Sequence, residues 1–140
     1  MAVRFPTLLL VMLVACGERV ESHYATFRDL ERASAGARSW MPEWLPESAT
    51  DIREWHDLDT NSTLVAFTVP NATPTLLSGC KPFRFTANPG SASWWPTDDS
   101  FASLKHFECE ERTSFAGGRI ETRRAGVALD QARNRLYFWR

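Results

Sequence analysis

An uninterrupted apolar run near the amino terminus limits how much of this chain can take part in a fold. The chain has 140 residues, and residues 8–15 carry no polar side chain after a short positive start at Arg4. A membrane-spanning helix needs roughly 20 apolar residues, whereas the apolar region of a cleaved signal peptide has about 7–15. We therefore expect residues 1–15 to be a signal peptide that the folded protein lacks.

The residues that end this run, Leu13-Val14-Ala15-Cys16, resemble the lipobox of bacterial lipoproteins. The resemblance implies cleavage before Cys16, a diacylglycerol thioether on its sulfur and an acylated amino group. Several acyl chains anchor a protein far better than one. Gly17 stands where an aspartate would retain a proteobacterial lipoprotein at the inner membrane, which implies the periplasmic face of the outer membrane in a host that has one. We favour this interpretation over an ordinary signal peptide with an incidental cysteine.

If Cys16 carries lipid, two cysteines remain, Cys80 and Cys109. Exported chains meet an oxidising compartment, where paired thiols usually close. A bridge between these two would close a loop of about 30 residues, worth roughly 3–4 kcal/mol in the chain-entropy model. The alternative is two separate buried thiols. We expect the disulfide, with Cys109 pointing inward beside Phe107.

The remaining chain is short enough for one domain, and we expect residues 16–22 to be a lipidated tether and residues 23–140 a single globular domain. A cap box at Thr26 and Asp29 predicts a first helix, and Ser48 and Asp51 predict a second. Thr97 can cap a short helix through Leu104. Alternating or aromatic-rich patterns predict strands over 63–69, 82–86 and 106–112, and a hairpin from 126–130 and 135–140. The pattern predicts an α+β domain, with one or two N-terminal helices packed on a small antiparallel sheet of four to five strands that ends in a C-terminal hairpin.

Charge is unevenly distributed, although the formal net charge is only −1. Residues 112–140 are rich in arginine, and guanidinium groups match phosphate geometry in two-point contacts. We hypothesise that four of these side chains share an exposed face that binds phosphates of anionic lipid or lipopolysaccharide: Arg123, Arg124, Arg133 and Arg135. The alternative is that acidic side chains neutralise them within the fold, namely Asp98, Asp99 and the glutamates of residues 108–111.

His56, Asp57 and Asp59 lie close together in the sequence. An imidazole with carboxylates is what a general base or a metal site needs. On the expected helix, however, His56 and Asp57 would point about 100° apart, and Asp59 would fall in the following turn. We interpret the three residues as local turn chemistry, and we expect no catalytic residue, metal site or cofactor.

Trp94 and Trp95 precede a proline on an expected loop. Aromatic rings of this kind stack on sugars, so the pair is a candidate glycan platform. Burial in a small core is the alternative, and we favour it because aromatic side chains dominate the energetics of such cores.

The stretches 21–27, 40–46 and 48–62 are similar to a small family of uncharacterised bacterial lipoproteins, and this resemblance brings no function with it. We expect a non-enzymatic, lipid-anchored binding or interaction domain of the cell envelope. Its partners would be the membrane and an anionic lipid, lipopolysaccharide or an envelope protein, and not a nucleic acid. The alternatives are a glycan-binding module that uses Trp94 and Trp95 and, less favoured, a hydrolase around His56.

Overall fold

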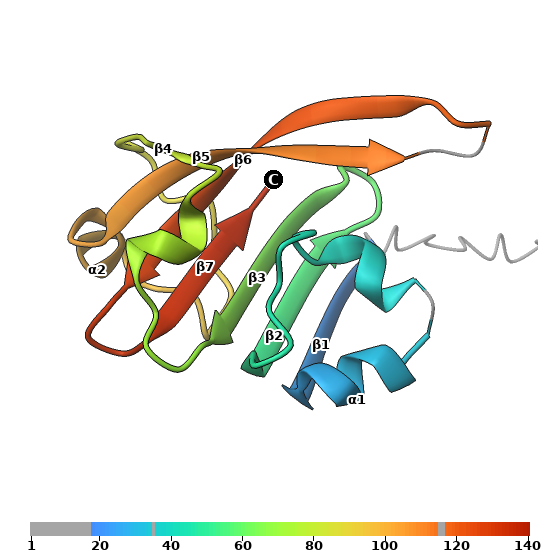
Figure 1. Cartoon of the computed structure of the whole chain (residues 1–140), viewed down its shortest axis with the longest axis horizontal. Helices are drawn as coiled ribbons and strands as arrows, with labels where there is room; N and C mark the ends of the chain where they lie inside the picture. The colour runs from blue at the N-terminus through green and yellow to red at the C-terminus, as the bar shows by residue number, and fades with distance from the viewer. Residues whose placement is uncertain (1–17, 35, 115–116) are drawn as a thin grey trace, which may run out of the picture.

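The computed structural model describes residues 18–34, 36–114 and 117–140. These residues form one seven-stranded antiparallel sheet in the order β1-β2-β3-β7-β6-β5-β4 (Figure 1). The strands are β1 (Arg19–Thr26), β2 (Thr50–Asp57), β3 (Ser62–Thr68), β4 (Lys81–Pro82), β5 (Lys105–Ser114), β6 (Ile120–Asp130) and β7 (Arg135–Trp139). The helical elements are α1 (Phe27–Arg32), α2 (Asp98–Ala102) and the 3-10 turns η1 (Ala37–Trp40) and η2 (Pro74–Leu77).

The antiparallel strands all run between the same two ends of the sheet. β1 to β3 form a meander, the chain then crosses to the other edge, and β4 to β7 form a second meander that returns to pair β7 with β3. Because all neighbours are antiparallel, β1, β3 and β6 begin at the same end. We call this the proximal end, since it lies nearest to Cys16 in the chain, and the opposite one the distal end.

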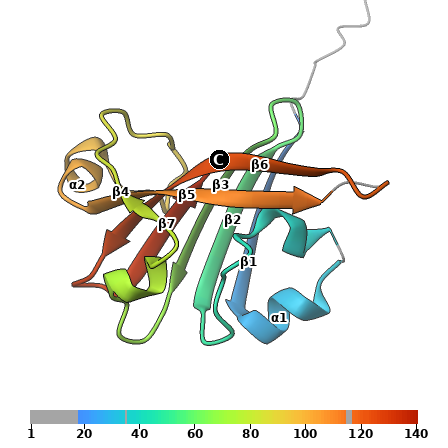
Figure 2. The same cartoon turned by 45° about the horizontal axis from the view of Figure 1, so that its top comes forward.

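Both faces of the sheet are covered, so the molecule has three layers (Figure 2). On the first face, α1, η1 and η2 lie over a core that includes Ile52, Val65, Phe67, Val127 and Phe138. On the second face, the segment between β4 and β5, which contains α2, lies over a smaller core: Leu64, Ala66, Trp95, Phe101, Ala128 and Tyr137.

The expected α+β class is wrong, because the fold is mainly β with only short helices. The second expected helix is strand β2, and its pattern has a period of two rather than 3.6. Ile52 lies in the first core and Trp55 packs on the second, so the two side chains point to opposite faces. A strand places neighbours in alternation in this way. Residues 19–22, which we assigned to the tether, are part of β1, and β4 covers two residues instead of the expected 82–86.

The predictions that depend only on residues close together in the sequence agree better with the structure. α1 has the expected capping box, in which Asp29 N–H donates to Thr26 Oγ1 at 3.2 Å and Thr26 N–H donates back to Asp29 Oδ2 at 3.0 Å. The C-terminal hairpin of β6 and β7 turns at residues 131–134, as expected, and Asn134 takes a positive φ of 54° there. The short helix after Thr97 is present as α2, although it ends at Ala102.

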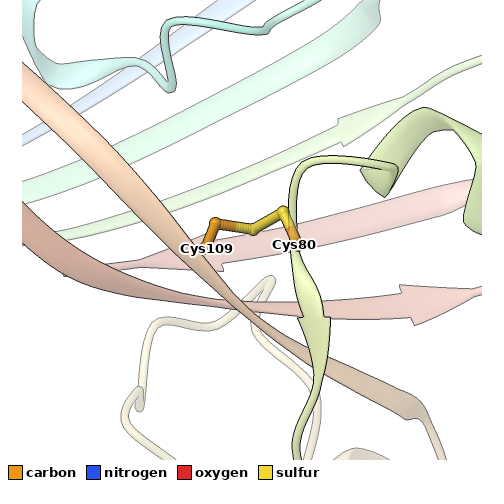
Figure 3. The surroundings of a disulfide bond; sticks show 2 residues. All are labelled: Cys80 and Cys109. Atoms are coloured by element: carbon orange, nitrogen blue, oxygen red, sulfur yellow. A yellow bond between two sulfur atoms is a disulfide. The ribbon is translucent and has the colours of Figure 1, made fainter.

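The expected disulfide joins Cys80 to Cys109, with 4.3 Å between their Cα atoms (Figure 3). Cys109 is buried in the first core together with Phe107, also as expected. The bridge fastens β5 to the residue that immediately precedes β4. All the strands and helices, together with the disulfide, lie within residues 18–140, so the part of the chain that starts at Glu18 contains the whole described fold.

β5 and β6 continue past the rest of the sheet at the proximal end (Figure 1). β6 pairs with β7 only from Gly126 onward, whereas its pairing with β5 extends to Ile120. We call residues 110–114 and 120–124 the arm. Within the described residues, no helix is both long and apolar enough to cross a bilayer.

Candidate functional site

Five polar side chains, of which four are buried and Arg140 is partly exposed, form a row on the first face, near the proximal end. His56 on β2 is opposite Thr63 on β3, and Thr63 exchanges backbone hydrogen bonds with Arg140. Arg140 Nη1 lies 3.2 Å from Glu111 Oε2 on β5. The fifth member is Glu54, two residues before His56 and therefore on the same face. We call these five residues the polar row: Glu54, His56, Thr63, Glu111 and Arg140.

His56 is 6% exposed and is enclosed from both sides. Its Nδ1 is hydrogen-bonded to Glu54 Oε1, and the ring of Trp40 stacks on its imidazole with centroids 4.0 Å apart. Burial raises the pKa of Glu54, although the hydrogen bond with His56 opposes this effect. The Glu54–His56 pair therefore holds η1 against the sheet through the contact with Trp40. The imidazole is enclosed and is not presented to a substrate.

The other half of the polar row is an ion pair. Burial raises the pKa of Glu111, while the charge of Arg140 opposes this change. Arg140 also donates from Nη2 to the carbonyl of Ser39 in η1 at 2.6 Å. Glu111 Oε1 and Thr63 Oγ1 are buried and have no hydrogen-bond partner within the described ranges. Buried polar atoms of this kind are usually satisfied by internal water.

Asp57 and Asp59 do not join His56. Asp57 lies on the opposite face of β2 and accepts hydrogen bonds at Oδ1 from the backbone N–H of Asp59, at 2.9 Å, and of Thr60. Its Oδ2 lies 3.5 Å from Nε of Arg19. The expected turn chemistry is therefore present for Asp57. Three members of the polar row, Glu54, Thr63 and Arg140, were not predicted from the sequence. Glu54 becomes recognisable as a partner of His56 only when β2 is known to be a strand.

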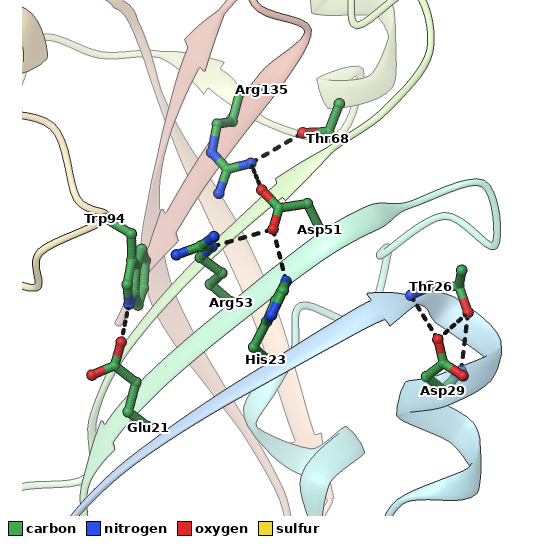
Figure 4. A network of polar contacts seen from close by, with 9 residues as sticks. All are labelled: Glu21, His23, Thr26, Asp29, Asp51, Arg53, Thr68, Trp94 and Arg135. Carbon is green, nitrogen blue, oxygen red and sulfur yellow. Dashed lines mark hydrogen bonds and ion pairs between the residues drawn. The ribbon is translucent and has the colours of Figure 1, made fainter.

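Trp94 and Trp95 pack against the second face of the sheet. Trp95 is buried and donates from Nε1 to Asn88 Oδ1 at 2.7 Å. Trp94 is partly buried and donates from Nε1 to Glu21 Oε1 at 2.5 Å (Figure 4). The two rings meet edge to face, with centroids 5.8 Å apart. They do not form the open platform that stacking on a sugar would require.

The four candidate arginines lie at two different ends of the sheet. Arg123 and Arg124 are on the arm, on opposite faces of β6 because they are consecutive in a strand. Arg133 is in the turn after β6 and Arg135 begins β7, so both are distal. Each has a carboxylate partner: Glu121 for Arg123, Glu108 for Arg124, Asp130 for Arg133 and Asp51 for Arg135. They therefore do not form one exposed face.

Arg135 belongs to a polar network centred on Asp51 (Figure 4). Asp51 Oδ2 accepts from Arg135 Nη1 at 2.7 Å, and Oδ1 is 3.2 Å from Arg53 Nε and 2.8 Å from His23 Nε2. Burial alone would raise the pKa of Asp51, but the hydrogen bonds from Arg135 and Arg53 outweigh it and lower that pKa. The network joins β1, β2 and β7 across the distal end.

Two pockets open at the distal end, on either side of Leu104 and Lys105. The polar pocket has a volume of about 520 Å³ and is lined by side chains that include Lys105, Asp130, Gln131, Arg133 and Tyr137. The apolar pocket has a volume of about 720 Å³ and lies between the end of β4, the end of α2 and the start of β5. Both volumes are in the range of small-molecule sites. No motif in the sequence indicated either of them.

Comparison with known proteins gives a family match over the first three strands. Residues 18–68 match the family model described as the YbbD head domain. The match runs from β1 to the end of β3 and includes three members of the polar row, Glu54, His56 and Thr63. Searches of curated proteins and of solved structures gave no match.

Proposed function

We propose that this chain is a lipid-anchored, non-enzymatic binding domain of the cell envelope that presents its distal pockets away from the membrane. The observation that carries this proposal is the start of β1 at Arg19, three residues after the lipobox cysteine. Three residues span at most about 10 Å, so the lipid would hold the proximal end of the sheet close to the bilayer. The eight residues of β1 would separate the distal end from it by about 25 Å.

The side chains with acid–base chemistry support a binding role over a catalytic one. His56 is stacked under Trp40 and bonded to Glu54. His106, also buried, lies 2.8 Å through Nε2 from the carbonyl oxygen of Phe101. Both imidazoles therefore hold covering segments on the sheet. The disulfide supports export, because such bonds persist in oxidising compartments.

The lipid anchor is tested on Cys16. We expect mass spectrometry of the mature protein to find an acylated, lipid-modified Cys16 at the amino terminus. We expect Cys16→Ser to leave unprocessed precursor and to remove the mature protein from membrane fractions. A mature amino terminus at another residue, or an unmodified Cys16, would contradict the lipoprotein proposal. Cys16 belongs to residues 1–17, which lie outside the described residues.

A glycan-binding role remains the second candidate, but at a different place. The polar pocket exposes the side chains of Lys105, Gln131 and Arg133, whose polar groups can bond to sugar hydroxyls, whereas Trp94 and Trp95 are already bonded within the fold through Nε1. A titration of the chain that starts at Glu18 with a soluble murein disaccharide tests this. Amide shifts in residues 130–137 would support it, and their absence at millimolar probe would reject it.

A further inference from the structure

The lining of the apolar pocket is mainly hydrophobic. Its lining includes Pro82, Phe83, Ala102, Leu104 and Phe107. Phe83 is 48% exposed, one of the largest exposures among the apolar side chains of the described residues. Exposed apolar surface around a concavity commonly marks a binding site.

The only charges in the lining are positive. Arg84 and Lys105 belong to it, and none of its residues is acidic. Lys105 Nζ lies 3.3 Å from the neutral Oε1 of Gln131, and Arg84, which is exposed, has no ion-pair partner within the described ranges. In contrast to the arginines at positions 123, 124, 133 and 135, these two cations have no ion-pair partner within the described residues.

His106, the remaining polar side chain of the lining, is already occupied. Its Nε2 contacts the carbonyl of Phe101 at 2.8 Å, and its Nδ1 accepts from the backbone N–H of Phe85 at 3.3 Å. The first contact requires a proton on Nε2 and the second requires a free lone pair on Nδ1. Both ring nitrogens of His106 are therefore already bonded within the fold, which leaves the two cations as the groups that can recognise a charge.

The walls are fixed before any ligand arrives. Lys81 and Pro82 pair with β5, and Phe83 N–H donates to the carbonyl of His106 at 3.0 Å. The disulfide holds Cys80, directly before β4, to the same strand. A preformed site loses less conformational entropy on binding than a flexible one.

We propose that the apolar pocket binds an amphipathic anion, with an alkyl chain against the wall around Phe83 and the anionic head group at Arg84 and Lys105. This inference deepens the proposed function by naming a ligand class for the distal end, and its biological setting rests on that function. A neutral alkyl compound would lose the contact with both cations. A cationic one would be repelled.

The test uses the chain that starts at Glu18, with its disulfide intact, and matched eight-carbon probes. We expect octanoate to shift the amide resonances of residues 82–84 and 102–107 in NMR titrations and to bind roughly tenfold more tightly than octanol, because a charge-assisted contact is worth more than a neutral one. Arg84→Gln and Lys105→Gln should each weaken octanoate severalfold and leave octanol unchanged. Phe83→Ala should weaken both probes.

Ile120→Ala is the matched control, since Ile120 is also an exposed apolar residue, at 52%, but lies on the arm. It should leave both affinities unchanged, and circular dichroism should show that each variant remains folded. Equal affinities for octanoate and octanol would overturn the proposal, as would octanoate shifts that the Arg84 and Lys105 variants do not change. Because this test is independent of Cys16, a failure here leaves the lipid anchor standing, and a failure of the anchor leaves octanoate binding standing.

Discussion

At the scale of single residues, Asp51 combines an uncommon backbone conformation with two arginine neighbours and one histidine neighbour. Its φ is 44°, in the left-handed region that asparagine and aspartate tolerate better than most residues. Its carboxylate contacts Arg135, Arg53 and His23. The sequence pattern predicts Asp51 in a helix cap, because an aspartate three residues after a serine is typical of a capping box and also occurs, as here, at the start of a strand. What decides between them is Arg135, which is 84 residues away.

Replacing Asp51 by Asn should remove the charge while keeping a residue suited to positive φ. We expect the free energy of unfolding at pH 7 to fall by up to about 1 kcal/mol, a modest effect because the carboxylate is 41% exposed and exposed ion pairs are screened. Since folding lowers the pKa of Asp51, its contribution is present above the ordinary aspartate pKa of 3.8 and is lost as the pH falls through the lower, folded-state value.

Urea denaturation of wild type and Asp51→Asn between pH 7 and pH 3 measures this contribution. The difference between the two proteins should shrink toward the acid end. Asp59→Asn, at an exposed turn position outside the network, should show no comparable difference at either pH. If the difference in the free energy of unfolding between wild type and Asp51→Asn stayed constant across this pH range, the lost stability would come from packing and not from charge.

At the scale of elements, the central strands pack so closely that one position admits only glycine. Gly126 on β6 is directly opposite Trp139 on β7, and a Cβ at position 126 would overlap the indole of Trp139. That indole cannot easily move, because Phe85 and Phe101 contact it at centroid distances of 4.8 and 5.4 Å. Gly126→Ala should therefore lower the free energy of unfolding by about 1–3 kcal/mol, as overpacked cores do.

Gly79→Ala is the control for this substitution. A Cβ at Gly79 would meet no atom within 4 Å, so the alanine should be neutral or stabilise the fold by up to about 1 kcal/mol through the unfolded state. Thermal and urea denaturation of both variants would compare them. Equal stabilities for the two variants would show that Trp139 can move aside at little cost.

The arm is the element that a membrane contact would use, since its exposed arginines are proximal. A juxtamembrane arginine contributes about 1 kcal/mol near an anionic surface, and salt screens it. We expect the chain that starts at Glu18 to bind anionic vesicles weakly at low salt and to dissociate by about 0.5 M salt. Arg123→Gln with Arg124→Gln should weaken binding roughly tenfold or more.

Arg28→Gln with Arg133→Gln is the charge-matched control, because it removes two exposed arginines from the distal end. It should leave vesicle binding almost unchanged. Equal weakening by the two pairs, or equal binding to neutral vesicles, would show that the arm does not direct the contact. Vesicle co-sedimentation measures all of these outcomes.

The elements that could be predicted from sequence are those with local signals. The capping box at Thr26 and the polar turn at residues 131–134 involve neighbours in the chain, and both are where the sequence placed them. β2 was missed because Glu54 and His56 occupy inward positions that an apolar residue usually fills. β1 was missed because an edge strand with mostly exposed side chains has no alternation to detect. Which side chains meet across β2, β3, β5 and β7 follows from strand order, and no local pattern contains it.

At the scale of the whole molecule, the two covered faces explain why the sheet tolerates a largely buried polar row. Each central strand is enclosed on both sides, so Leu64 and Val65 are both buried although they are neighbours in β3. The polar row lies near the border of the first core, where η1 and the carboxyl terminus close it. Buried ion pairs such as Glu111 and Arg140 contribute little net stability, but removing one partner leaves an uncompensated charge. The two apolar cores therefore stabilise the fold, while the polar row fixes the position of η1 on the sheet.

The disulfide adds a link between an edge strand of the sheet and its core. Cys80 and Cys109 are 29 residues apart, and β4, the edge strand beside Cys80, has only two residues of its own to hold it. In the chain-entropy model a loop of this length contributes roughly 3–4 kcal/mol by restricting the unfolded chain. Reduction of the wild-type protein should therefore lower its denaturation midpoint clearly.

A variant with Cys80→Ala and Cys109→Ala separates the bridge from its packing. It should be about 2–5 kcal/mol less stable than the oxidised wild type and slightly less stable than the reduced one, because Cys109 is buried and alanine leaves a small gap beside Phe107. A reductant should shift the wild-type midpoint and leave the variant unchanged, which denaturation with and without reductant would show. If oxidised wild type and variant unfolded at the same denaturant concentration, β4 would be held by its pairing with β5 alone.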